Sequence, residues 1–277
     1  MKKITFVGGG SMAEALISGI LENEFVSRKN VWVTNHSNQE RLESLKDRYS
    51  INGSYNLNEL FEGTDIVILA MKPKDASAAI DKIRAYLTEE MLVVSVLAGV
   101  SINTIEMLSG KQLAIARAMP NTSAAVGKSA TAIAVNDRVT ENQLEMVRKL
   151  FETVGLATFV EEGQLDAVTG LSGSGPAYIY YLIEAMENSA VEIGLEKQIA
   201  QELIVQTLIG AAEMVKNSSK PPEQLRREVT SPGGTTEAGM RILEESGVKQ
   251  AFISCIKTAS AQSKKMGDAL CSQLKVH

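Results

Sequence analysis

The chain of 277 residues opens with a short apolar run that meets glycines and then a helical pattern. The run is Ile4 to Val7, and Gly8-Gly9-Gly10-Ser11-Met12-Ala13 follows it directly. The segment from Ala13 to Asn23 then repeats apolar residues at helical spacing. Gly8 suits a tight turn, Gly10 lets a ligand approach the backbone, and Ala13 lets the helix pack closely. This pattern is typical of a strand, a phosphate-binding turn and a helix that together bind a dinucleotide.

Short β-rich runs alternate with helix-length segments through the first half of the chain. Residues 4–7, 31–34, 66–70 and 92–97 are expected to form buried parallel strands, and 39–49 a second helix. Further strands are predicted at 113–118, 131–135 and 157–160, around a helix at 141–151. This alternation predicts a doubly wound α/β sheet. We therefore expect a Rossmann-type dinucleotide-binding domain over residues 1–162.

The second half of the chain has only helical periodicity. The predicted helices cover 176–193, 197–216, 224–229, 236–245 and 248–266, with breaks at Gly194, at 217–222 and at Gly247. Some of them are almost continuously apolar, as around Leu203, Ile204 and Leu208, and such helices need another layer. Such a domain packs either on itself or on a second subunit, and we favour the second: an all-helical domain over residues 163–277 that binds substrate and forms a homodimer.

The composition limits the possible partners. A hydrophobic fraction of 44% supplies a sizeable core, and a net charge of −5 argues against binding to nucleic acid. No segment has the length and apolarity of a membrane span or signal peptide, so we expect a cytoplasmic protein that does not bind membranes. The two cysteines, Cys255 and Cys271, lack metal-ligand spacing; we expect inert thiols and no metal site.

The end of the second strand bears on the choice of cofactor. An NAD site usually carries an acid here, whereas this chain reads Val33-Thr34-Asn35-His36-Ser37. Asn35, His36 and Ser37 can donate hydrogen bonds to a 2′-phosphate, and Arg41 is either a further donor or a solvated helix residue. NADPH is therefore favoured, with NADH as the alternative.

Three later loops follow strands whose carboxyl ends should flank the cofactor: Ala70-Met71-Lys72-Pro73, Ala98-Gly99-Val100 and Met119-Pro120-Asn121-Thr122. Lys72 is expected near a phosphate or ribose, and Asn121 near the nicotinamide; the alternatives are a surface lysine and a turn asparagine. The predicted cofactor-binding residues are Gly8, Gly10, Ser11, Met12, Ala13, Asn35, His36, Ser37, Ala70, Lys72, Pro73, Ala98, Gly99, Met119 and Asn121.

Two further glycine-rich turns open helices in the second half. They are Leu171-Ser172-Gly173-Ser174-Gly175-Pro176 and Ser231-Pro232-Gly233-Gly234-Thr235-Thr236. Backbone N–H groups at Gly234, Thr235 and Thr236 can hold a carboxylate, although serine and threonine also serve as ordinary caps of helical turns. The chain has only two histidines, His36 at the predicted adenosine end and His277 at its terminus. A cyclic imine fits this shortage of proton donors, because its nitrogen is basic enough to arrive protonated.

These motifs resemble those of the pyrroline-5-carboxylate reductase family. The resemblance covers the whole chain and is most specific at Val229 to Thr236 with Ala238-Gly239, and at Val168 to Tyr178. It implies NAD(P)H-dependent reduction of L-1-pyrroline-5-carboxylate to L-proline, the last step of proline synthesis. It also implies a homodimer that interlocks through its helical domains, and further assembly of dimers.

The resemblance also implies roles for individual residues. Thr236 matches the threonine that hydrogen-bonds the ring nitrogen and is the predicted catalytic residue, while Ser231, Gly234 and Thr235 match the carboxylate loop. Predicted substrate-binding residues are Ser174, Ser231, Gly233, Gly234, Thr235 and Thr236. One departure is His36, where bacterial relatives often carry arginine, a stronger phosphate partner than neutral imidazole.

Other interpretations remain open at this point. A β-hydroxyacid dehydrogenase would need a lysine on the helix predicted at 176–193, which contains none, whereas a general imine reductase or a reductase of six-membered imines would share these motifs. A protein that binds NADPH without catalysis would keep the first glycine turn but would have no use for the second.

Overall fold

The computed structural model describes the backbone of residues 2–274 and the side chains up to residue 269. The chain divides into two compact units. One runs to Pro176 and takes up the chain again from Lys257, and the other is Ala177–Ile256. The sheet ends at Phe159, shortly before the domain boundary expected at residue 162, and that boundary stays a prediction.

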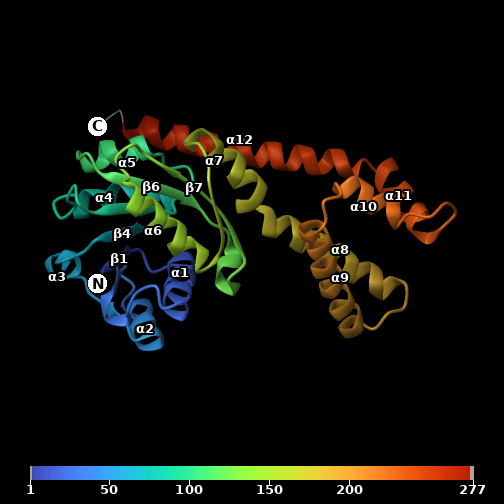
Figure 1. The fold of residues 1–277 in the computed structure, drawn as a ribbon, viewed down its shortest axis with the longest axis horizontal. Coiled ribbons are helices and arrows are strands. Elements are labelled where there is room, and N and C mark those ends of the chain that lie inside the picture. The colour runs from blue at the N-terminus through green and yellow to red at the C-terminus, as the bar shows by residue number, and fades with distance from the viewer. Residues whose placement is uncertain (1, 275–277) are drawn as a thin grey trace. The chain divides into compact units, whose positions relative to one another are not determined.

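The first unit is built on one sheet, which among the described residues has 8 strands in the order β3-β2-β1-β4-β5-β6-β7-β8 (Figure 1). The strands are β1 (Ile4–Val7), β2 (Val31–Thr34), β3 (Asn52–Gly53), β4 (Ile66–Leu69), β5 (Leu92–Ser95), β6 (Ala114–Met119), β7 (Ser129–Val135) and β8 (Gly155–Phe159). Ile4 pairs with Val31 on one side and with Ile66 on the other, both in parallel register. The central strands therefore end at one edge, as the sequence pattern predicts.

Strand β7 is antiparallel to β6, unlike its neighbours. Only residues 120–128 connect the two, partly as the short helix η3 (Thr122–Val126), and a parallel crossover needs a dozen or more residues. The helix α6 (Glu141–Glu152) supplies such a crossover between β7 and β8, which are parallel. A capping box at Thr140 and Gln143 fixes the start of α6.

Helices cover both faces of the sheet. The helices α1 (Ser11–Glu22), α2 (Gln39–Tyr49) and α6 bury Leu16, Leu45 and Phe151 in one hydrophobic core. The helices α3 (Leu57–Phe61), α4 (Ala76–Ile83) and α5 (Ile102–Ser109) bury Leu60, Ile80 and Ile105 in a second core on the other face. Because both faces of the strands are buried, β1, β4 and β5 are apolar along almost their whole length.

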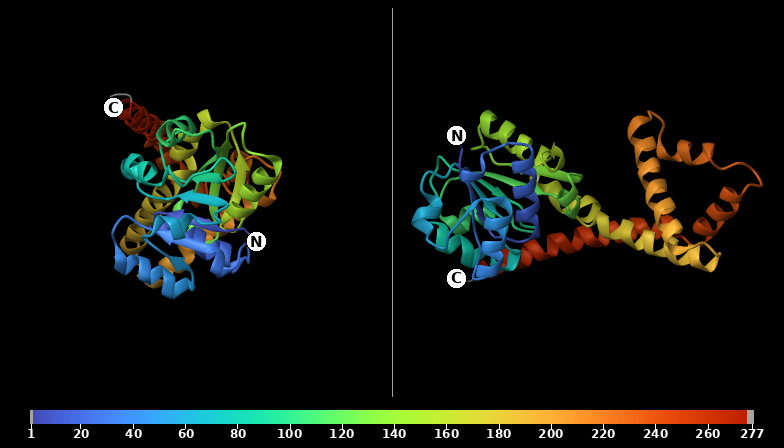
Figure 2. Two further views of the ribbon diagram at one scale, coloured as in Figure 1. Left: turned by 90° about the vertical axis from the view of Figure 1, so that its left-hand side faces the viewer. Right: turned by 90° about the horizontal axis from the view of Figure 1, so that it is seen from below.

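The chain after the sheet is helical. Its elements are η4 (Glu162–Gln164), α7 (Leu165–Val168), the π-helical turn η5 (Thr169–Gly173), α8 (Gly175–Glu192), α9 (Lys197–Asn217), α10 (Pro222–Glu228), α11 (Thr235–Glu245) and α12 (Val248–Leu274). Figure 2 shows α12 as one continuous helix in red. The apolar spacing predicts this helix only to Met266, whereas it continues through Gly267.

The second unit buries few of its apolar side chains. Ala190, Ala200 and Ile204 form its small core. Many large apolar residues are instead exposed, including Tyr181, Ile193 and Leu203. Surfaces of this kind mark contacts with other protein chains. No helix in residues 2–274 has the length and hydropathy needed to cross a membrane.

Candidate functional site

The glycine loop after β1 is shaped by the different demands on its glycines. Gly8 has a φ of +117°, and a Cβ atom there would lie 2.5 Å from the carbonyl carbon of Ala70. Its N–H donates to the carbonyl oxygen of Thr34 over 2.9 Å. Gly10 is the N-cap of α1, and a Cβ atom there would meet no described atom within 4 Å. Gly8 therefore suits the tight turn after β1, where its backbone contacts Thr34 and Ala70, whereas Gly10 leaves the start of α1 open.

The N-terminus of α1 is suited to an anion. The backbone N–H groups of Ser11, Met12 and Ala13 are first-turn donors with no acceptor inside the helix. Among the described side chains, none caps this end. These amides and the positive end of the helix dipole favour a diphosphate, which fits the predicted role of this segment.

A cavity of about 270 Å³ lies beside the glycine loop. Most of its wall is apolar, and a few polar groups complete it. Its lining residues are Val7, Gly8, Thr34, Asn35, His36, Tyr55, Leu57, Met71, Asp75, Ala78, Ala79, Lys82 and Ile83. An apolar wall with a few polar groups suits the adenosine half of a dinucleotide.

The loop after β2 is organised by the side chain of Asn35. Its Nδ2 donates to the carbonyl oxygen of Asn38 over 2.6 Å, and its Oδ1 accepts from the N–H of Asn38 and the hydroxyl of Tyr55. Asn35 therefore shapes the loop. His36 and Ser37 are exposed beside it, with His36 Nδ1 and Ser37 Oγ 3.1 Å apart. Both side chains are therefore open to solvent and can donate hydrogen bonds to an anion.

Arg41 supports the glycine loop. Its Nε donates to the carbonyl oxygen of Gly9 over 2.8 Å, and an Nη donates to Glu14 over 2.6 Å. Glu14 also accepts from Arg48 and Tyr49. The hydrogen bond from Arg41 is the main reason why the pKa of Glu14 lies below its usual value. Sequence reasoning offered Arg41 as a phosphate donor or a solvated helix residue; in the structure its side chain is 30% exposed and its guanidinium bonds Gly9 and Glu14.

Two of the later predicted loops follow neighbouring parallel strands. Ala70 N–H donates to the carbonyl oxygen of Val7, which holds the start of the loop after β4 against β1. Lys72 is exposed and precedes Pro73, the first residue of the short helix η2 (Pro73–Asp75). Gly99, in the loop after β5, has a φ of +74°. The parallel strands bring both loops to the sheet edge that carries the glycine loop.

Asn121, after β6, is buried and uses its side chain internally. Its Nδ2 donates to the carbonyl oxygen of Ser172 over 3.0 Å, and its Oδ1 accepts from the N–H of Ser123. The first bond fastens the end of β6 to the turn η5. Met119 packs on the same turn, where a Cβ atom at Gly173 would lie 2.7 Å from its Cε. Both predicted residues thus contact the segment that leads to Ser174.

Ser174 follows a π-helical turn, a feature often found at functional sites. Its N–H donates to the carbonyl oxygen of Thr169 over 2.9 Å. Ser174 lines a second cavity of about 200 Å³ together with Ala98 and Gly99. The remaining lining residues are Thr169, Ala259, Gln262, Ser263 and Met266. The structure therefore brings Ser174 together with two of the predicted cofactor-binding residues.

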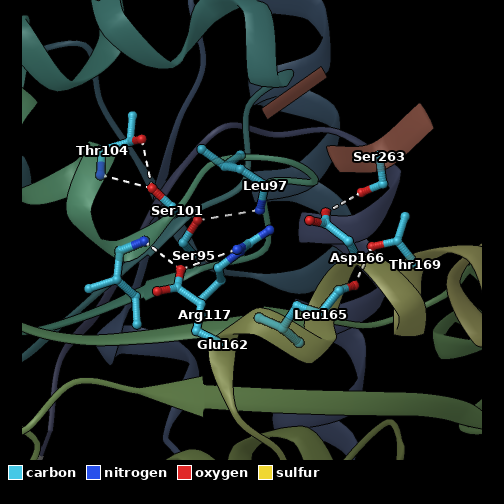
Figure 3. A network of polar contacts seen from close by, with 11 residues as sticks. Ser95, Leu97, Ser101, Thr104, Arg117, Glu162, Leu165, Asp166, Thr169 and Ser263 are labelled. Atoms are coloured by element: carbon cyan, nitrogen blue, oxygen red, sulfur yellow. Dashed lines mark hydrogen bonds and ion pairs between the residues drawn. The ribbon is translucent and has the colours of Figure 1, made fainter. Parts of the chain in front are cut away.

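Polar contacts anchor the segment from Ser95 to Thr104, which contains the Ala98–Gly99 loop (Figure 3). Glu162 accepts from the N–H of Ile102 over 2.8 Å and from the guanidinium of Arg117 over 3.1 Å. The side chain of Arg117 is only 9% exposed, so this ion pair is largely desolvated on the cation's side. Ser101 caps α5 by accepting from the N–H of Thr104. These bonds fix the chain directly after the Ala98–Gly99 loop.

The predicted substrate loop lies in the second unit, before α11. Gly233 has a φ of +72°, and Gly234 is the N-cap of α11. The N–H of Gly234 donates to the carbonyl oxygen of Ser231 over 3.0 Å, and the N–H of Gly233 to Glu237 over 2.7 Å. The amides of Thr235 and Thr236 are first-turn donors, and both residues are exposed. They are the part of this loop best placed to receive an anion.

Sequence reasoning missed several residues of these sites. Glu237 could have been found, because an acid at the third position of a helix often turns back to cap its start. Tyr55, Gln262 and Met266 gave no signal, since they join their cavities from distant parts of the chain. His277 and the side chain of Cys271 lie outside the described residues, and the thiol of Cys255 is free and exposed.

Comparisons with known proteins agree with this organisation. Residues 162–266 match the family described as pyrroline-5-carboxylate reductase dimerisation, and residues 3–99 match the one described as NADP oxidoreductase, coenzyme F420-dependent. The pyrroline-5-carboxylate reductase 2 of Bacillus subtilis is 52% identical over 266 residues, which cover 96% of this chain and 95% of that protein.

Two solved structures are similar over almost the whole chain. A pyrroline-5-carboxylate reductase from Coxiella burnetii has a TM-score of 0.87 at 35% identity, covering 96% of this chain and 98% of that one. A pyrroline carboxylate reductase from Plasmodium falciparum with NADP bound has a TM-score of 0.88 at 31% identity, with coverages of 96% and 98%. The predicted fold class, a Rossmann-type sheet followed by a helical dimerisation domain, is thereby confirmed. The chain belongs to the pyrroline-5-carboxylate reductase family.

Proposed function

We propose that this protein reduces L-1-pyrroline-5-carboxylate to L-proline with NADPH, the last step of proline biosynthesis. The observation that carries the proposal is the second open helix end, at α11, where Thr235 and Thr236 are exposed after a Ser-Pro-Gly-Gly turn. A protein that only binds a dinucleotide has no use for this second anion site. Membership in the reductase family supports the same activity.

The first unit supplies groups that suit the cofactor. The first-turn amides of α1 would hold the diphosphate, and the cavity beside Gly8 would take the adenosine. His36 and Ser37 would meet the 2′-phosphate, with Asn35 keeping their loop in shape. The NADP bound in the Plasmodium falciparum relative and the NADP oxidoreductase match support NADPH, and NADH is the alternative to rank against it. Bound NADPH supplies a hydride from its nicotinamide ring.

The substrate residues would act by binding and positioning. The amides of Thr235 and Thr236 would hold the carboxylate, with Ser231, Gly233 and Gly234 forming the turn that presents them. The hydroxyl of Thr236 would hydrogen-bond the ring nitrogen, and Ser174 would line the substrate side of its cavity. Reduction adds a hydride to the imine carbon while the ring nitrogen ends protonated. A basic imine nitrogen gains its proton without a catalytic histidine, and His36 lies by the adenosine cavity.

We also propose that the protein works as a homodimer in the cytoplasm, with further assembly of dimers. The dimerisation match over residues 162–266 and the exposed apolar side chains of α8 and α9, such as Tyr181 and Leu203, support the dimer. The exposed free thiol of Cys255 supports a reducing compartment. Light scattering of the purified protein would give the size of the assembly.

The direct test is to follow oxidation of NADPH and NADH in parallel with L-1-pyrroline-5-carboxylate, and to identify the product by chromatography. A six-membered cyclic imine carboxylate serves as the comparison substrate. We expect proline as the product and a higher kcat/KM with NADPH. Cofactor binding without turnover of the five-membered imine would contradict the proposed function.

A further inference from the structure

The last part of α12 packs directly on the loop after β5. A Cβ atom on Gly267 would lie 2.7 Å from the carbonyl oxygen of Gly99, and one on Gly99 would lie 3.3 Å from the nitrogen of Gly267. The first distance is a clash and the second a tight contact, and both involve backbone atoms, which cannot move aside as a flexible side chain would. Gly99 also has a positive φ, so its loop conformation disfavours other residues. The two backbones therefore touch at a place where only glycine fits on either side.

A hydrogen bond one turn earlier fixes the same part of α12. Ser263 is 6% exposed, and its Oγ donates to Asp166 of α7 over 2.7 Å (Figure 3). The carbonyl oxygen of Ser263 would lie 3.7 Å from a Cβ atom on Gly99. The helix is thus held to α7 by its side chain and to the β5 loop by its backbone. These two contacts set the position of α12 against the loop.

Hydrogen bonds also hold the chain just before and just after the Ala98–Gly99 loop. The N–H of Leu97 donates to Ser95 over 3.4 Å, and that of Ile102 to Glu162 over 2.8 Å. Ala98 and Gly99 lie between these two anchors and face the cavity that Gln262 and Met266 also line. Any displacement of α12 would therefore change the place where this short loop meets a ligand.

We propose that Gly267 and Ser263 are positioning residues that set the Ala98–Gly99 loop for the nicotinamide half of the cofactor. This inference rests on the proposed function, because Ala98 and Gly99 share a cavity with Ser174, the proposed substrate residue, and the nicotinamide must reach the imine there. Gly267 acts by its lack of a side chain and Ser263 through Asp166, so neither needs to touch the cofactor. The close fit also accounts for a glycine in the interior of α12, where other residues form helix better.

The decisive variant is Gly267→Ala. Its binding is measured with two ligands, so that effects on the nicotinamide half and the adenosine half of the cofactor can be told apart. NADPH has both halves, whereas 2′,5′-ADP has only the adenosine half and its 2′-phosphate. We expect the Kd of NADPH to rise about tenfold by calorimetry, and kcat with the imine to fall about ten- to a hundredfold. The Kd of 2′,5′-ADP should stay at the wild-type value. Alanine is the better helix former, so a poorer helix cannot explain such a loss.

Two further variants control for folding. Gly163→Ala adds the same methyl group to the same unit where it would meet no described atom within 4 Å, and should behave as wild type. Asp166→Ala removes the acceptor of Ser263, whereas Asp166→Asn keeps an oxygen that can accept. We expect Asp166→Ala to raise the Kd of NADPH but not that of 2′,5′-ADP. In Asp166→Asn the Kd of NADPH should return toward the wild-type value.

Two results would overturn the inference. One is unchanged NADPH binding and turnover in Gly267→Ala and Asp166→Ala. The other is an equal loss of affinity for NADPH and for 2′,5′-ADP, which would indicate a general structural role. If the wild type binds NADPH but does not reduce the imine, the proposed function fails instead, and the comparison of the two ligands still decides the role of Gly267.

Discussion

Arg41 Nε donates a hydrogen bond of 2.8 Å to the carbonyl oxygen of Gly9, so α2 holds the glycine loop through a side chain. The same guanidinium is paired with Glu14 in the first turn of α1. A carboxylate so close to a diphosphate would repel it, and Arg41 and Arg48 offset that charge. Through its bonds to Gly9 and Glu14, Arg41 therefore keeps both the geometry and the charge at the start of α1 suited to an anion.

Arg41→Ala should weaken the binding of NADPH and NADH to a similar extent. The hydrogen bond from Arg41 to Gly9 supports the loop that would hold the diphosphate, and both cofactors have that diphosphate. Loss of one charge-assisted hydrogen bond corresponds to about 1.5 kcal/mol, or about tenfold in Kd. Calorimetric titration of both cofactors would measure this. Arg48→Ala is the matched control, since Arg48 also pairs with Glu14 but is 68% exposed and does not bond Gly9. A loss confined to NADPH would place Arg41 at the 2′-phosphate instead.

The pKa of Glu14 predicts how the fold responds to acid. It lies below the ordinary value of 4.5 in the folded chain, chiefly through the hydrogen bond from Arg41. A carboxyl group with a lowered folded pKa stabilises the fold above that ordinary value, and the contribution is lost as the pH falls through the folded pKa. Glu14→Gln should therefore lower Tm at about pH 7, and the difference in Tm from the wild type should close as the pH falls through the folded pKa of Glu14.

An exposed carboxylate provides the comparison for this pH dependence. Glu152 is exposed on α6, and Glu152→Gln should change Tm little at neutral or at acid pH. If the difference in Tm between Glu14→Gln and the wild type stays constant from neutral to acid pH, the ionised form of Glu14 does not stabilise the fold.

Gly8→Ala and Gly10→Ala should fail in different ways. A methyl group at Gly8 would clash with the backbone of Ala70, and the φ of +117° disfavours alanine, so the fold should lose about 1 to 3 kcal/mol or more. A methyl group at Gly10 would meet open space, so Tm should be kept while NADPH binding is lost, because the methyl occupies the path of the diphosphate. Differential scanning calorimetry with and without NADPH separates the two effects. Normal NADPH binding by Gly10→Ala would remove the diphosphate from this helix end.

The sequence pattern predicted the sheet well because buried parallel strands leave strong signals. Expected strands at 4–7 and 31–34 and the helix at 39–49 agree with β1, β2 and α2 residue for residue. The strand β3 was missed, because two residues carry no periodicity. The rule that ligands meet the carboxyl ends of parallel strands correctly grouped the glycine loop with the loops after β4 and β5.

The uses of individual side chains could not be read from the sequence. Asn35 and Asn121 have the chemistry to bind a cofactor, and each also has one hydrogen bond to a residue far away along the chain, Tyr55 and Ser172. The continuation of α12 through Gly267 could not be read from local spacing either, and at that point its backbone packs against Gly99. Such pairings are set by tertiary packing, which local propensity does not encode.

His36→Arg should favour NADPH over NADH. The imidazole of His36 is exposed beside the adenosine cavity, and a guanidinium there would bind a 2′-phosphate with two charge-assisted hydrogen bonds. We expect the ratio of the two Kd values to shift about tenfold toward NADPH. His36→Gln, which keeps a neutral donor, should change the ratio little. An equal effect of His36→Arg on both cofactors would place residue 36 away from the 2′-phosphate.

Thr236→Ala should slow reduction of the imine while the fold and cofactor binding stay intact. Thr236 is exposed in the first turn of α11, and one hydrogen bond from its hydroxyl to the ring nitrogen would be worth about ten- to a hundredfold in kcat/KM. Thr236→Val removes the hydroxyl at constant shape and should behave like alanine, whereas Thr236→Ser should keep most of the activity. If valine and serine prove equally active, the hydroxyl has no part in the reaction, and the amides of Thr235 and Thr236 alone would explain why the α11 turn is built as it is.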